Sequence, residues 1–153
     1  ESAGFGPPPR IRGHASATRV GPMAFGSGRA APPDDARSDN PEVLNPAGRL
    51  HLSLADWATT LRIFLDGAGV LLPSSLERIL TVPPERGAMA MGWMPAAGLP
   101  GASYGMQGSN TAWIATALLS ADRRRAVAVV ANDGRSRLFG ATARFAAQLL
   151  ESS

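Results

Sequence analysis

The hexapeptide Ala126–Ala131 consists only of alanine and valine, and it constrains the fold more than any other part of the chain. A strand that is apolar at every position is typical of a strand covered on both faces of a sheet and paired along both edges. The charged turn Arg123–Arg125 precedes it, and the turn residues Asn132–Gly134 follow it. Few other segments are candidates to pair with this strand. We therefore expect that a partner segment is missing from these residues.

Helical periodicity predicts two helices ahead of this strand. Ser53 is a good N-cap, with Asp56 three residues later as in a capping box, and Gly67 and Gly69 provide a left-handed end. A second helix is expected to begin near Pro73. It should end before Pro83-Pro84. The expected apolar faces are Leu54, Trp57, Ala58, Leu61 and Leu65 for the first helix, and Leu76, Ile79 and Leu80 for the second.

From residue 88 the apolar pattern changes to a period of two, which predicts strands. We expect a strand over Met89–Trp93, a short strand over Ser103–Gln107, and a hairpin of Trp113–Leu119 with Ala126–Ala131. A final helix should be capped by Ser136 and continue through Leu150. Its expected face is Leu138, Thr142, Phe145 and Leu149, with Phe139, Ala146 and Leu150 beside them. The predicted fold class is α/β of the α+β kind, with an antiparallel sheet of three to four strands flanked by helices.

Residues 1–48 are rich in glycine, proline, serine and arginine. Proline removes backbone donors and glycine loosens the chain, so we expect no regular elements there. We predict a long loop segment over residues 1–48 and a folded portion over residues 49–153.

Composition excludes several classes of site. The chain has no cysteine, so it has no disulfide and no thiolate metal ligand, and no His/Asp/Glu cluster has metal-ligand spacing. We predict no metal and no cofactor.

The net charge is only +3 and Arg123–Arg125 is interpreted as a solvated turn, so no nucleic-acid partner is expected. No run approaches the length of a membrane span. The chain begins with Glu1, which suggests a processed or truncated start.

The turn Gly108-Ser109-Asn110 follows a predicted strand, at a place where backbone N–H groups can meet a substrate. Taken alone, it is more often a structural turn.

The two histidines, His14 and His51, are expected to serve loops or packing. Trp57 is expected in the core. For Trp93 and Trp113 both a core position and a place along a substrate cleft remain open, and the methionines are interpreted as gap-filling residues.

Several strings, taken in chain order, resemble the C-terminal half of the serine β-lactamase and penicillin-binding-protein-like hydrolases, in their class C and esterase branch. The resemblance covers nearly all of this chain but only about half of the family's usual length. The matching strings are Ala3–Gly6 with Gly13-His14, Asp39–Gly48 with His51–Ala58, Met91–Trp93, Gly108–Thr111 with Trp113, and Val130–Gly134.

In that family a serine from a Ser-x-x-Lys motif attacks a carbonyl, with the Lys and a Tyr from Tyr-x-Asn managing the proton. This chain contains no lysine and no Tyr-x-Asn, so it carries no catalytic residue of that kind. The family's third motif is usually Lys-Thr-Gly or His-x-Gly. The resemblance places Met106 at its cationic position, Gln107 at its middle and Gly108 at its glycine. Ser109 would then donate an oxyanion N–H, and Asn110 would shape the turn.

The resemblance implies the C-terminal portion of a periplasmic or secreted hydrolase that forms an acyl-enzyme. Its substrate would be an ester, an amide or a β-lactam. Met106 carries no charge, which favours an uncharged ester or amide, with hydrogen bonds from Gln107 in compensation. The missing N-terminal half would supply the nucleophile, and we expect this chain alone to be inactive. Two alternatives are a non-catalytic relative that binds a ligand or partner, and a free-standing interaction domain.

Overall fold

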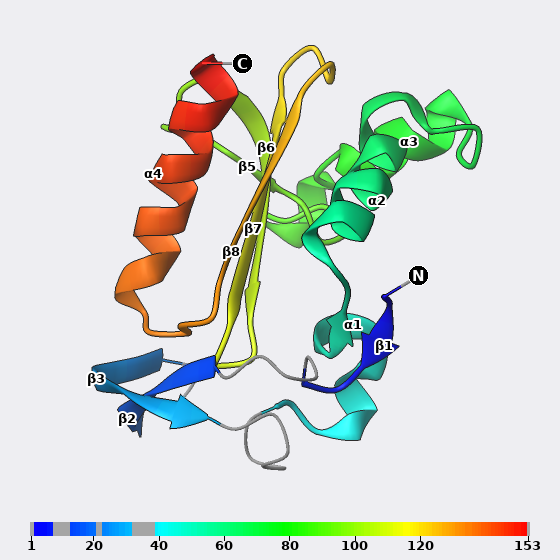
Figure 1. The fold of residues 1–153 in the computed structure, drawn as a ribbon. Coiled ribbons are helices and arrows are strands. Elements are labelled where there is room, and N and C mark those ends of the chain that lie inside the picture. Colours follow the sequence, from blue (N-terminus) through cyan, green and yellow to red (C-terminus); the bar gives the residue numbers. More distant parts are fainter. Residues whose placement is uncertain (1, 8–12, 21–22, 32–38, 153) are drawn as a thin grey trace. The chain divides into compact units, whose positions relative to one another are not determined.

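The computed structural model describes residues 2–7, 13–20, 23–31 and 39–152 (Figure 1). The chain divides into two compact units that are each discontinuous in sequence. Unit 1 comprises Glu1–Asp56, Gln107–Ala115 and Val130–Thr142, and unit 2 comprises Trp57–Met106, Thr116–Val129 and Ala143–Ser153. Helices and antiparallel sheets are both present, so the α+β class is confirmed.

The main sheet has four strands in the order β5-β6-β7-β8. Strand β5 (Met94–Pro95) pairs antiparallel with β6 (Ala102–Ser109), followed by β7 (Ile114–Ser120) and β8 (Ala126–Ala131). The strands expected at Ser103–Gln107, Trp113–Leu119 and Ala126–Ala131 are thus confirmed, with shifted ends for the first two.

The burial expected for the apolar strand β8 is only partly found. Its side chains do contact both core clusters, but they are half-buried to exposed, and Val130 is 51% exposed. The buried centre is β7, where Ile114 is 2% and Leu119 0% exposed. The reason is the strand order, because β8 lies at the end of the sheet with one neighbouring strand.

The strand predicted over Met89–Trp93 is wrong. The backbone bends there, with the Ala90 N–H donating to the Trp93 carbonyl at 2.8 Å and Gly92 at a φ of 84°. Hydrogen bonding to a neighbouring strand begins only at β5, which pairs with β6. Met89 and Met91 are exposed and Trp93 is buried, so the alternation reflects a bend that presents one side chain to the core.

The two predicted helices are confirmed as α2 (Leu54–Asp66) and α3 (Pro73–Leu80). The backbone N–H of Asp56 donates to Ser53 Oγ at 3.1 Å, and Gly67 ends α2 at a φ of 79°. Their apolar faces form the first core cluster in unit 2. Its buried members are Leu61, Leu76, Leu80, Trp93, Ala117 and Leu119, with Trp57 packed against it.

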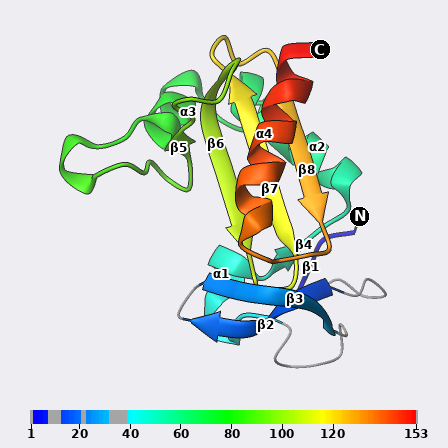
Figure 2. The same ribbon diagram turned by 90° about the vertical axis from the view of Figure 1, so that its left-hand side faces the viewer.

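Helix α4 (Arg137–Ser152) exists as expected, but its buried face differs from the prediction. Phe145 is 51% and Leu149 37% exposed, whereas Ala146, Ala147 and Leu150 are buried. These small residues pack against Leu118, Val127 and Val129 in the second core cluster of unit 2. Within unit 2, α2 and α4 cover opposite faces of the sheet (Figures 1 and 2).

Residues 1–48 contain regular elements where none was expected. Strand β1 (Gly4–Phe5) pairs with β4 (Leu50–His51), and β2 (Gly13–Val20) pairs antiparallel with β3 (Met23–Ala31). The prolines of this region lie outside all three of its strands, so they bound the strands rather than prevent them. Short helical segments follow at η2 (Glu42–Leu44), α1 (Asn45–Gly48) and, in unit 2, η3 (Pro84–Arg86).

No helix in the described part of the chain is long and apolar enough to cross a membrane.

Adjacent leucines on α4 test the buried face of this helix. Leu150→Ala should lower the free energy of unfolding by about 2–5 kcal/mol, because it opens a cavity in the core. Leu149→Ala removes the same atoms from a side chain that is 37% exposed and should cost less than about 1 kcal/mol. Urea unfolding followed by circular dichroism measures both. Equal losses would contradict the assigned helix register.

Candidate functional site

The Gly108 turn, defined as residues 108–113, connects β6 to β7 and is closed by its own polar side chains. Ser109 Oγ donates to the Trp113 carbonyl at 2.7 Å and accepts from the Thr111 N–H at 3.0 Å. Asn110 Oδ1 accepts from the backbone N–H of Trp113 at 3.2 Å. Asn110 therefore shapes the turn, and the hydroxyl of Ser109 is occupied by backbone partners.

The buried carboxylate of Asp39, which lies outside residues 108–113, bonds to the turn. Asn110 Nδ2 donates to Asp39 Oδ1 at 2.9 Å, and Asp39 Oδ2 accepts from Arg49 Nε at 2.9 Å. The Asp39 side chain is 3% and that of Arg49 14% exposed. Arg49 Nη1 also donates to Asn45 Oδ1 at 2.9 Å. A carboxylate withdrawn from water needs such charge-assisted partners, so this cluster fixes the turn against the segment 39–49.

The sequence analysis did not predict the roles of Asp39 and Arg49. Asp39 and Asn110 are 71 residues apart, and neither periodicity nor local motif spacing reports such a contact. The only signal was that both residues fall in or beside strings that carried the family resemblance.

The backbone around the turn is tightly packed and locally strained. Thr111 has a φ of 80°, which is rare for a β-branched residue. A Cβ added at Gly134 would lie 2.3 Å from the Thr111 carbonyl carbon, and one at Gly13 would lie 2.6 Å from the Ala112 oxygen. His14 joins these segments, since its N–H donates to Ala112 O and its carbonyl accepts from the Gly134 N–H, both at 3.0 Å.

Gly108 differs from the other glycines whose surroundings the structure describes. It is exposed, its φ lies outside the left-handed region, and a Cβ there would meet no atom within 4 Å. Neither conformation nor packing therefore requires glycine at this position. The missing side chain leaves the backbone at Gly108 open to the approach of another molecule.

The two residues before Gly108 serve the fold. Met106 is partly buried and packs against the first core cluster of unit 2. Gln107 Nε2 donates to the Phe139 carbonyl at 2.9 Å and to Thr142 Oγ1 at 3.1 Å. Both side-chain N–H groups of Gln107 are thus committed, so the expectation that they compensate for the missing cation at a substrate is not supported.

The titratable groups near the turn are held in local structural contacts. His14 Nδ1 lies 2.9 Å from Asn132 O, and His51 Nδ1 lies 2.8 Å from Gly6 O, in keeping with the packing roles expected for both. The hydrogen bonds from Arg135 lower the pKa of Asp133. Among the described residues no group of three or more His, Cys, Asp or Glu side chains is placed to hold a metal ion.

The indole of Trp113 is also part of this region. Trp113 is partly buried, and its Nε1 is a buried donor with no hydrogen-bond partner in the described part of the chain. Its ring lies against Gly13, since a Cβ there would be 2.7 Å from Trp113 Cε2. Trp93, in contrast, is a core residue at 1% exposure.

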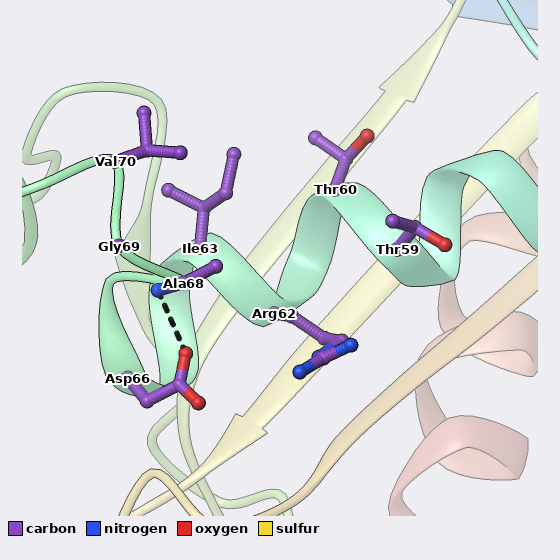
Figure 3. A pocket seen from close by; sticks show the side chains of 8 residues that line it. All are labelled: Thr59, Thr60, Arg62, Ile63, Asp66, Ala68, Gly69 and Val70. Atoms are coloured by element: carbon purple, nitrogen blue, oxygen red, sulfur yellow. Dashed lines mark hydrogen bonds between the residues drawn. The ribbon is translucent and has the colours of Figure 1, made fainter.

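An open hollow of about 650 Å³ lies on unit 2, along α2 and the turn after it (Figure 3). The carboxylate in its lining, that of Asp66, accepts a hydrogen bond from the Ala68 N–H at 2.8 Å just after the helix. A second hollow of about 670 Å³ lies between α3 and residues 83–91. Their polar groups are those of ordinary exposed helices, and we assign no chemistry to either.

Comparisons with models of protein families, with curated proteins and with solved structures found no match to this chain.

Two glycines in unit 1 test this description of the turn. Gly134→Ala should destabilise the protein by about 1–3 kcal/mol or more, because its Cβ would strike backbone atoms that cannot rotate away. Gly108→Ala should leave stability unchanged or raise it by about 0.4–1 kcal/mol, because the site is open and alanine reduces the entropy of the unfolded chain. Thermal and urea unfolding compare the two variants. A large loss for Gly108→Ala would show that the turn is closed.

Proposed function

We propose that this chain is the substrate-side portion of a β-lactamase-related serine hydrolase that acts on an ester, an amide or a β-lactam. The observation that carries the proposal is Gly108, an exposed glycine at the end of β6 that neither backbone conformation nor packing requires. In this role, the absence of a side chain lets a substrate carbonyl approach the strand end.

The proposed chemistry is stabilisation of a developing negative charge. A serine supplied by another polypeptide segment attacks the substrate carbonyl while a base from that segment takes the hydroxyl proton, and the carbonyl oxygen becomes an oxyanion. Its collapse to the acyl-enzyme expels the alcohol or amine, which receives the proton. The backbone N–H of Ser109 donates one hydrogen bond to that oxygen. A preorganised donor of this kind contributes about 10²–10³-fold to the rate. The Asp39–Asn110 hydrogen bond supports the role, because a donor is effective only when its backbone is held before the reaction.

The properties of Met106 bear on the substrate. A thioether packed against an apolar cluster offers no charge to a substrate carboxylate. We therefore assign an uncharged ester or amide rather than a substrate recognised through its carboxylate.

A non-catalytic binding domain is the second candidate. The same packing of Met106, together with the committed N–H groups of Gln107, favours it, because the position that a cation occupies in the resembling enzymes serves the core here. In that case the Gly108 turn still meets a ligand, but no acyl-enzyme forms.

The test uses the protein extended by its encoded upstream region, alongside the isolated chain. A fluorescent penicillin and a fluorogenic activated ester report covalent labelling and turnover. We expect the uncharged ester to acylate the extended protein more readily than the penicillin, because Met106 offers no charge to the penicillin carboxylate, and we expect neither reagent to label the isolated chain. Gly108→Val in the extended protein should lower kcat/KM by about 10²-fold or more, because the side chain fills the approach to the oxyanion donor. Ala97→Val, in an exposed loop, is the matched control and should leave activity unchanged.

Two results would contradict the proposal. A stable serine adduct on the isolated chain would place the nucleophile within these residues. An extended protein that binds an ester analogue at the Gly108 turn without ever being acylated would support the binding domain instead.

A further inference from the structure

The side chain of Arg49 is held on two sides and is largely withdrawn from water within unit 1. Its Nε donates to Asp39 Oδ2 and its Nη1 donates to Asn45 Oδ1, both at 2.9 Å. The side chain is only 14% exposed. Its backbone is fixed as well, since the Arg49 carbonyl accepts the Gly6 N–H at 3.0 Å. The guanidinium therefore has a defined position, unlike that of a surface arginine.

Asp39 links this arginine to the Gly108 turn. One carboxylate oxygen accepts from Arg49, and the other accepts from Asn110 Nδ2 at 2.9 Å. At its other end, Asn110 Oδ1 accepts from the Trp113 N–H at 3.2 Å. A continuous path of hydrogen bonds thus runs from a cation, through a carboxylate and a neutral amide, to the backbone of the turn beside Ser109.

The charge of Asp39 bears directly on the chemistry proposed for the turn. An unpaired carboxylate one hydrogen bond from residue 110 would oppose the negative charge that forms on a substrate oxygen at the Ser109 N–H. Like charges repel strongly at such a range where water is excluded. Arg49 cancels most of that repulsion, because its guanidinium nitrogen lies 2.9 Å from a carboxylate oxygen of Asp39.

A second carboxylate in unit 1 is neutralised in the same way. Arg135 Nε donates to both carboxylate oxygens of Asp133, at 2.8 and 2.7 Å. Asp133 precedes Gly134, where a Cβ would lie 2.3 Å from the Thr111 carbonyl carbon, so this ion pair also lies close to the turn. These two carboxylates near the turn are thus each paired with an arginine.

We propose that Arg49 is a positioning residue for the oxyanion donor at the Gly108 turn, acting through Asp39 and Asn110. It allows a buried carboxylate to hold the turn while the charge of that carboxylate is cancelled. The inference rests on the proposed hydrolase function and adds one requirement to it. Residue 110 must be an uncharged amide, with the charged pair one hydrogen bond further from the substrate oxygen.

Exchanging the side chains at positions 39 and 110 tests this requirement. The double variant Asp39→Asn with Asn110→Asp keeps every hydrogen bond of the path. Position 39 still accepts from Arg49 and now donates to position 110, which still accepts from the Trp113 N–H. The net charge is also the same, but the negative charge has moved next to Ser109.

The exchange is made in the protein extended by its encoded upstream region, with a fluorogenic uncharged ester as substrate. We expect kcat to fall by about tenfold or more, because the carboxylate now opposes the developing oxyanion. KM should stay within about twofold, because the effect arises only in the transition state. The matched control is Gln148→Glu with Glu151→Gln, which moves a carboxylate along the exposed side of α4 and should leave kcat unchanged.

A second pair of variants separates charge from contact. Arg49→Gln leaves the Asp39 carboxylate without a cation and should lower kcat by about tenfold or more. Adding Asp39→Asn removes that carboxylate, while a side-chain oxygen at position 39 still accepts from Asn110. This double variant should return kcat to within about threefold of the wild-type value. Urea unfolding of the same proteins checks that each is folded, and where the exchanged variant does not fold, this second pair decides.

Three results would overturn the inference. Unchanged kcat in the folded exchanged variant would show that contacts alone hold the donor and that the charge has no part. A double variant of Arg49→Gln with Asp39→Asn that stays about tenfold slow would show that the guanidinium itself is required. An extended wild-type protein that is never acylated would remove the hydrolase proposal and this inference together, and that failure is visible before any variant is measured.

Discussion

The fold depends on the burial of β7 between two apolar layers. Leu118 and Leu119 point to opposite faces of this strand, and each is almost fully buried in its own cluster. Burying side chains of this size contributes about 1.5–3 kcal/mol each. Because β7 lies between β6 and β8, its burial determines the positions of both neighbouring strands. Strand β6 carries the Gly108 turn at its end, and β8 remains at the edge.

The Gly108 turn depends on a second constraint, which is polar. Asp39 is buried within unit 1, where Arg49 and Asn110 both donate hydrogen bonds to its carboxyl oxygens. These bonds hold Asn110, and Asn110 in turn holds the backbone of Trp113. The strained φ of Thr111 persists because the hydrogen bonds of Ser109 and Asn110 hold the backbone on both sides of it. The Gly108 turn is therefore held by its own hydrogen bonds and by Asp39.

Apolar periodicity predicts the helices that bury one face. It does not predict the hairpin β2–β3 or the whole buried face of α4. Helices α2 and α3 could be predicted because capping residues and apolar spacing agree, as at Ser53 and Leu61. The face predicted for α4 is only partly right. Thr142, Ala146 and Leu150 are buried, but Phe145 and Leu149 are exposed, because a closely packed helix favours small residues such as Ala146 at the contact. The hairpin β2–β3 is not predicted because its strands contain many alanine, glycine and serine residues, which give little propensity for a strand.

The candidate site was predicted in part. The five residues Met106 to Asn110 differ in their contacts. Met106 packs against the core, Gln107 bonds to the start of α4, and Gly108 is exposed. Asp39 and Arg49 could not be predicted, since a contact over 71 residues follows from the fold and not from local sequence.

Within the part of the chain that the structure describes, the main sheet is covered on both faces and has no strand beyond β8. Residue-resolved amide hydrogen exchange by NMR tests this arrangement most directly. We expect slow exchange for the amides of β7 and an alternating pattern along Ala126–Ala131, with every second amide exchanging rapidly because it points away from β7. Uniform protection of all β8 amides, equal to that of β7, would contradict the account.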